Sequence, residues 1–135
     1  MTLDNLALFR MVAQRFGWLE QRQGVTAQNI ANADTPGYSA RDIEAFDAVL
    51  SRAGGARMAP RMTHAAHMTA PETTPGDART GRADRVYEVS PTGNSVVLEQ
   101  QLMTMQETAA QHRFAQNLYT KHLGMIRMAI GSGQR

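Results

Sequence analysis

The side chains most capable of chemistry are few and poorly placed for it. His64 and His67 have the spacing of a metal-binding pair, but no carboxylate stands at a supporting spacing. Glu20 and His112 could serve as an acid and a base, yet each falls within a regular apolar repeat, where a structural role is expected. The chain has no cysteine, no glycine-rich phosphate loop and no nucleophile elbow. The sequence therefore predicts a protein that is not an enzyme and uses no metal, cofactor or small-molecule substrate.

Charge is nearly balanced along the chain. The 135 residues include 14 basic and 12 acidic ones, for a net charge of +2, and Lys121 is the only lysine. Because no basic cluster is interleaved with aromatic residues, we expect no nucleic-acid binding. The first residues lack the basic and apolar regions of a cleaved signal peptide, and no window is apolar enough to span a membrane. Export, if it occurs, would need another route.

Two long stretches carry the helical repeat that would position the other residues. In residues 1–33 and again in 94–131, apolar positions recur at alternating steps of three and four residues, as along a heptad seam. A second apolar stripe runs through Leu8, Met11 and Trp18 in the first stretch and through Phe114, Leu118 and Met125 in the second. The seams consist of Leu6, Phe9, Ala13, Phe16, Glu20, Gln23, Ala27 and Ile30, and of Leu98, Leu102, Met105, Ala109, His112, Gln116, Tyr119, Leu123, Ile126 and Ile130.

The seams match best in an antiparallel pair, in which Glu20 meets Gln116 and Gln23 meets His112. The sequence thus predicts a mainly α fold whose terminal helices form one core, an antiparallel coiled-coil-like hairpin. We interpret the four polar residues as a layer that fixes the register; the alternative is that they face water. Because the second stripes would stay wet, such a hairpin is marginal alone. We expect a monomer, partly unfolded at its ends, that orders on assembly into a helical polymer.

The first helix should end in a tight turn. Asn32 can adopt the left-handed conformation of a helix C-terminus, and Asn29 lies on the same face one turn earlier. Thr35 is forced to be extended by Pro36, and Pro36-Gly37 suits a type II turn, which needs positive φ at the glycine. Tyr38 then offers a ring that can anchor the joint. Asn94 or Ser95 is the expected cap of the C-terminal helix.

Residues 34–93 are expected to hold this turn, a short helix and an irregular insertion. Ser39 to Asp42 has the form of a capping box, and apolar residues at helical spacing follow from Ile43. Proline and glycine punctuate residues 56–92, where Val86–Val89 is the one strand candidate, with pairing expected near Arg61–Thr63. The whole chain is interpreted as a single domain.

Residues 29–38, Asn-Ile-Ala-Asn-Ala-Asp-Thr-Pro-Gly-Tyr, resemble the N-terminal motif of bacterial flagellar rod proteins. The continuation Ala40-Arg41-Asp42 is most similar to the proximal rod subunits, while Ser39 stands where many relatives carry lysine. The segment from Gly93 onward is similar to the C-terminal helix of the same family. This resemblance implies a structural rod subunit of the flagellar basal body, needed for motility, with terminal helices in the inner core.

The resemblance also implies the partners and the location of the protein. Its partners would be other rod proteins, the adaptor that joins the rod to the membrane ring, and the type III export apparatus, which would carry it to the periplasmic rod without a cleaved signal peptide. Two alternatives remain at this stage, namely a different rod subunit and a secreted coiled-coil adaptor or export chaperone.

Overall fold

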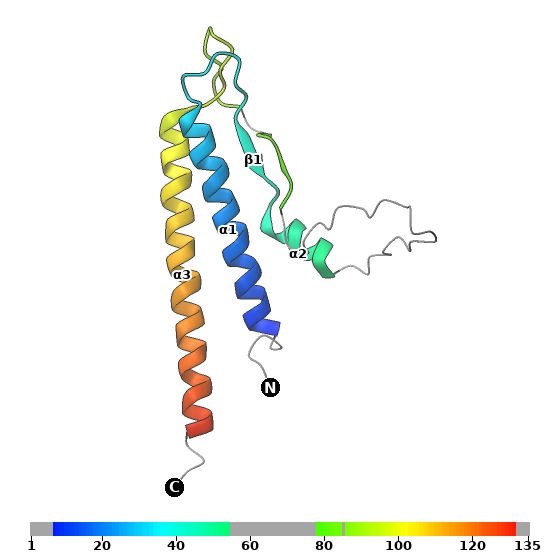
Figure 1. Cartoon of the computed structure of the whole chain (residues 1–135), viewed down its shortest axis with the longest axis vertical. Helices are drawn as coiled ribbons and strands as arrows, with labels where there is room; N and C mark the ends of the chain where they lie inside the picture. Colours follow the sequence, from blue (N-terminus) through cyan, green and yellow to red (C-terminus); the bar gives the residue numbers. More distant parts are fainter. Residues whose placement is uncertain (1–6, 55–77, 85, 132–135) are drawn as a thin grey trace, which may run out of the picture.

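Two long helices dominate the computed structural model, which describes residues 7–54, 78–84 and 86–131. These residues form the helices α1 (Ala7–Ala31), α2 (Phe46–Gly54) and α3 (Leu98–Gly131) and the strands β1 (Arg41–Ile43) and β2 (Thr80–Arg82). The helices α1 and α3 lie side by side and run in opposite directions, while the small sheet and α2 lie beside α1 (Figure 1). The prediction of a mainly α chain with long terminal helices is confirmed.

The residues of α3 that are buried are small, whereas those of α1 include the large apolar side chains of Phe9, Val12 and Leu19. Thr26, Thr108 and Ala115 are all buried. The hydroxyl groups of both threonines donate to backbone oxygens one turn earlier in their own helices, at 2.9 Å and 2.7 Å, so their burial leaves no donor unpaired. The ring of Phe9 meets the edge of Tyr119 at a centroid distance of 5.3 Å nearer the other end.

The register of the two helices differs from the predicted one. His112 lies against Phe16, with ring centroids 5.0 Å apart, and therefore not opposite Gln23. Glu20, Gln23 and Gln116 are exposed, so the predicted polar layer is not brought together. The predicted pairing was wrong by about two helical turns. The physical reason is that α3 buries Thr108 and Ala115, the neighbours of the predicted Ala109 and Gln116, so a different face of this helix meets α1.

The buried face of each helix is also rotated relative to the predicted seam. In both helices the buried positions fall one residue before most of the predicted ones, as at Thr108 rather than Ala109 and at Ala115 rather than Gln116. Leu102 and Ile130 are consequently exposed. Leu6 lies outside the described residues. Half-buried positions among the predicted set are Phe16, Ile30, Met105, His112, Leu123 and Ile126.

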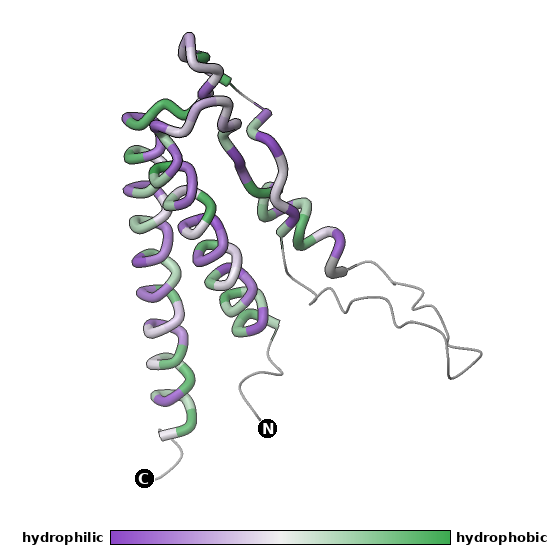
Figure 2. Tube along the Cα trace, turned by 45° about the horizontal axis from the view of Figure 1, so that its top comes forward, coloured by the Kyte–Doolittle hydropathy of each residue, from purple (hydrophilic) through white to green (hydrophobic). Residues whose placement is uncertain are grey.

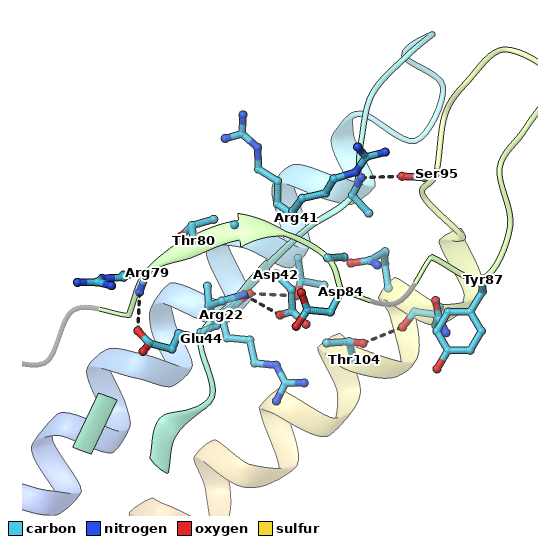
Figure 3. A pocket seen from close by; sticks show the side chains of 18 of the residues that line it. Arg22, Arg41, Asp42, Glu44, Arg79, Thr80, Asp84, Tyr87, Ser95 and Thr104 are labelled. Carbon is cyan, nitrogen blue, oxygen red and sulfur yellow. Dashed lines mark hydrogen bonds between the residues drawn. The ribbon is translucent and has the colours of Figure 1, made fainter. Parts of the chain in front are cut away.

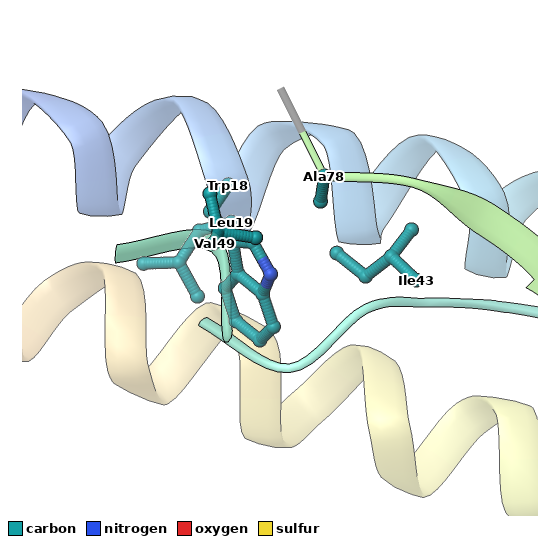
Figure 4. Packing of buried hydrophobic residues seen from close by; sticks show 5 residues of the cluster. All are labelled: Trp18, Leu19, Ile43, Val49 and Ala78. Carbon is teal, nitrogen blue, oxygen red and sulfur yellow. The ribbon is translucent and has the colours of Figure 1, made fainter. Parts of the chain in front are cut away.

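The main apolar cluster lies on the other side of α1, between this helix, the sheet and α2. It contains Trp18, Leu19, Ile43, Val49 and Ala78 (Figure 4). The indole nitrogen of Trp18 donates to the backbone oxygen of Glu44 at 2.8 Å, and its ring lies 5.9 Å from that of Phe46. The expectation that Trp18 would stay wet was wrong, because residues after the turn cover it.

The short elements also differ in part from expectation. Residues Arg41–Ile43 form β1, antiparallel to β2, so the capping box predicted at Ser39 to Asp42 is not formed and α2 begins only at Phe46. Val86–Val89 does not form a strand, which corrects that prediction. The proposed partner near Arg61–Thr63 lies outside the described residues.

Candidate functional site

The chain reverses at the turn that follows α1. Gly37 has a φ of +70°, and the Tyr38 amide donates to the Thr35 carbonyl at 3.3 Å, which confirms the predicted turn around Pro36. Asn32 does not take the left-handed conformation, because the described residues with positive φ are glycines. Instead its side-chain amide donates to a backbone oxygen of α1 at 2.8 Å and its side-chain oxygen accepts from Thr35 at 3.2 Å.

Asn29 ties three segments together. Its side chain is 2% exposed, and its amide nitrogen donates to the Arg41 carbonyl at 2.7 Å and to the Gln101 side-chain oxygen at 3.0 Å. Its oxygen accepts from the Arg41 amide at 3.0 Å and from the Tyr38 hydroxyl at 3.3 Å. Asn29 thus holds α1 to the turn, to the start of β1 and to α3, with its amide hydrogens and its oxygen all in use.

Asn94 holds the turn from the other side. It is buried, and its side-chain nitrogen lies within hydrogen-bonding distance of the carbonyls of Asn32, Ala33 and Thr35, at 2.7–2.9 Å. The sequence identified Asn94 only as a possible helix cap. Because α3 starts at Leu98, its role is instead to fasten the segment before α3 to the end of α1.

Two further contacts complete this joint. The Ser95 hydroxyl oxygen accepts from the Ala40 amide at 2.9 Å, and the Gly37 amide donates to the Thr92 carbonyl at 3.0 Å. Gly93 also has positive φ, +80°, and a Cβ atom at this residue would lie 3.5 Å from the Cα atom of Gly37. The site formed by Asn29, the turn and residues 92–95, here called the joint, therefore connects the end of α1 and the segment before α3 to the start of β1.

Arginine side chains connect the apolar cluster to α3. The Arg15 guanidinium lies 4.6 Å from the Trp18 ring centroid and 4.7 Å from that of Phe46, and it donates to the Gln111 side chain at 2.7 Å. Partial burial, followed by the nearby charge of Arg22, lowers the pKa of Arg15 from its ordinary value. Trp18 is therefore enclosed by cations as well as by apolar groups.

A cleft of about 790 Å³ lies between α1, the sheet and α3 (Figure 3). Its lining carries charges of both signs, and Glu44 accepts from Arg52 at 2.6 Å and from the Arg79 amide at 3.4 Å. Burial alone would raise the pKa of Glu44, but these two hydrogen bonds outweigh it and hold the pKa below its usual range. The buried Nε of Arg22 has no hydrogen-bond partner among the described residues.

The cleft shows no constellation of a known chemistry. Within the described ranges, no group of three or more His, Asp or Glu side chains is placed to hold a metal ion, and no helix is long and apolar enough to cross a membrane. His64 and His67 lie outside those ranges. Glu20 and His112 are far from forming an acid–base pair, since His112 packs on Phe16 and Glu20 is exposed.

Large apolar side chains line the side of α3 that faces away from α1. Phe114 and Met103 are each 71% exposed, and Met125 and Met128 are also exposed. Met103, Phe114 and Met125 are spaced by three helical turns, which keeps them on one stripe, and Thr108 and Ala115 lie roughly 80–140° around the helix from it. We call these four residues the outer stripe; Figure 2 shows the alternation of hydrophobic and hydrophilic residues along α3.

Comparison with known proteins gives the class of this chain. Residues 19–38, which include the second half of α1 and the turn, match the family described as flagella basal body rod protein. The matched stretch is therefore the one that ends α1 and forms the turn of the joint.

Full-length relatives identify the family more narrowly. The flagellar basal body rod protein FlgB of Escherichia coli (strain K12) is 30% identical, with 97% of this chain and 99% of the relative covered. FlgB of Cereibacter sphaeroides is 35% identical over 87% of this chain and 89% of the relative, and FlgB of Agrobacterium fabrum is 28% identical over 96% of each. The chain belongs to the FlgB family of flagellar basal body rod proteins and is a structural subunit of the rod.

Proposed function

We propose that the chain acts in the proximal rod as an incomplete helical unit that other subunits complete. In this proposal α1 and α3 form a coiled-coil-like pair in the inner core of the rod, corresponding to residues 1–33 and 94–131. The joint then directs residues 34–93 toward neighbouring subunits. Its neighbours are other rod proteins and the adaptor between the rod and the membrane ring.

The outer stripe is the observation that carries this proposal. The residues of α3 that are buried within the subunit are Thr108 and Ala115, whereas Phe114 and Met103 are left 71% exposed. Burying a large apolar side chain contributes roughly 1.5–3 kcal/mol. A stripe of four such side chains on one helix is therefore a surface that gains stability when other helices cover it. Methionine side chains in particular adapt to neighbours of different shape.

Predicted positions outside the stripe fit the same role. Tyr119 and Phe9 hold the helix pair together near the start of α1, and α3 continues well beyond this contact to Gly131. Leu123, Ile126 and Ile130 lie in this continuation, where Ile130 is 75% exposed. These residues would pack within an assembled core rather than within one subunit.

Replacing Phe114 and Met125 with serine tests this function. Because both are exposed, the change should leave the unfolding free energy of the isolated chain within about 0.5 kcal/mol of the parent. Rod assembly and swimming motility should nevertheless be lost. The matched control is Phe16→Ser, which removes a contact inside the helix pair and should lower the stability of the isolated chain as well. Normal basal bodies built from the double serine variant would contradict the proposed role of the outer stripe.

Two further parts of the proposal concern the free subunit. We expect it to be monomeric with helix ends that are partly unfolded before assembly, and to reach the periplasmic rod through the flagellar type III export apparatus without signal-peptide cleavage. Circular dichroism of the dilute chain tests the first part, since full and cooperatively melting helicity would contradict it. Mass spectrometry of the chain recovered from basal bodies tests the second, because an N-terminal truncation would indicate cleavage.

A further inference from the structure

The small sheet has an open edge. Glu44 donates from its amide to the Arg79 carbonyl at 2.8 Å, and Ala83 donates to the Ala40 carbonyl at 2.9 Å, so residues 79, 81 and 83 direct their peptide groups toward β1. The N–H and C=O groups of successive residues in a strand point to opposite edges of that strand. Those of Thr80 and Arg82 therefore point away from β1. All three residues of β2 are exposed, and this outer edge pairs with no described residue.

A segment with strand character lies unpaired a few residues later. Val86, Tyr87 and Val89 have the high strand propensity from which a strand is predicted, and they are 41%, 66% and 58% exposed. No hydrogen bond joins the backbone of Val86–Val89 to another described residue. Tyr87 projects beside the cleft, as Figure 3 shows. The segment has the sequence of a strand and lacks only a partner.

We propose that Val86–Val89 of one copy of this chain adds to the outer edge of β2 in the next copy, as a third strand of its sheet. An antiparallel register that places Glu88 opposite Thr80 and Val86 opposite Arg82 would satisfy the two outward-facing residues of β2. This register also places Tyr87 opposite Gly81, where nothing lies within 4 Å of the position that a Cβ atom would occupy. The tyrosine ring could therefore cover this glycine. This inference rests on the proposed assembly of several copies in the rod.

Charge and geometry point to a second copy as the occupant. In this register Glu88 and Arg82 are diagonal neighbours on one face, within reach of each other's long side chains, and neither makes an ion pair with a described residue. Within one copy β2 and Val86–Val89 are not paired with each other, and the amide of Ala83, after the end of β2, still donates to the Ala40 carbonyl. Two strands alone are marginal, so a third would stabilise the sheet. Each copy would give Val86–Val89 to one neighbour and accept the same segment of another neighbour at its own β2. Such a head-to-tail contact can repeat from copy to copy along a helical array.

The absence of cysteine makes a direct test possible. Residues directly opposite on paired antiparallel strands have Cα atoms about 4.5–5.5 Å apart, inside the range of about 4.4–6.8 Å that a disulfide needs. Cells would be made to express the chain with Gly81→Cys and Tyr87→Cys together, and basal bodies would be oxidised with copper phenanthroline. We expect disulfide-linked dimers and larger oligomers of the chain. The control pairs Tyr87→Cys with Asp47→Cys on α2 and should give several-fold less product.

The outcomes separate this inference from the proposed function. If the doubly substituted chain supports motility but yields no linked oligomers, the strand addition is refuted while the rod function stands. A disulfide confined to one chain, detected by mass spectrometry, would also refute it in favour of an intramolecular hairpin. If the cysteine pair prevents assembly, charge reversal decides instead. Arg82→Glu and Glu88→Arg should each reduce motility and their combination should restore it, whereas absence of rescue would overturn the pairing.

Discussion

The replacement Asn29→Asp changes one atom of the joint while keeping its shape. An ionised aspartate can accept hydrogen bonds but cannot donate, so the bonds to the Arg41 carbonyl at 2.7 Å and to the Gln101 side chain at 3.0 Å are lost. Two lost bonds cost about 1–3 kcal/mol at the usual net value of each. A buried charge facing two oxygen atoms adds roughly 1–3 kcal/mol more. We expect a loss of about 2–6 kcal/mol at neutral pH, a large part of the stability of a small domain.

The sign of the pH dependence gives a second and independent check. Burial beside two oxygen atoms should raise the folded-state pKa of the new carboxyl above its unfolded value of about 3.9. The protonated acid can donate one bond again, so the variant should be most stable below that unfolded value. It should lose stability as pH rises toward the folded-state pKa and remain constant above it.

The assay is urea unfolding at several pH values, followed by circular dichroism and by the fluorescence of Trp18, the only tryptophan. Asn32→Asp is the matched control, because the same change there affects an exposed bond within the end of α1 and should cost well under half as much. Equal stability of the Asn29→Asp variant and the parent at pH 7, or stability that rises with pH relative to the parent, would refute the assignment of Asn29 as the centre of the joint.

Three other changes should have distinct effects. Gly37→Val should impair swimming more than Gly37→Ala, because positive φ costs alanine about 1–2 kcal/mol and a β-branched residue more, although the site is sterically open. Asn94→Ala should cost about 1–3 kcal/mol in the same urea assay by removing the hydrogen bonds from a buried side chain that fasten residues 92–95 to the end of α1. Because the pKa of Glu44 is lowered, its ion pair with Arg52 should be intact above about pH 4.3 and weaken as pH falls through the folded-state value. Trp18 emission should report this acid step, and Glu44→Gln should abolish it.

The long helices and the turn were predictable because local chemistry determines them. A heptad-like repeat, Pro36-Gly37 and the residues around them carry their signals within a few positions. The joint was predictable only in part. Asn29 and Tyr38 stood out as polar anchors, but the role of Asn94 depends on a partner some sixty residues away, as in its bond to Asn32. No short-range pattern reports such a distant contact.

The error in the helix register has a physical cause that concerns function. The predicted seam of α3 ran through Ala109 and Gln116, whereas the buried residues are their neighbours Thr108 and Ala115. The large side chains of Phe114 and Met103 stay exposed on the outer stripe. In a free-standing helical protein this arrangement would lower stability without any return. In a rod subunit, as proposed above, the small residues of α3 would pack inside the chain and the large exposed residues would remain for contacts between chains. The two apolar stripes of the sequence would then serve two interfaces, of which an isolated subunit forms only the intramolecular one.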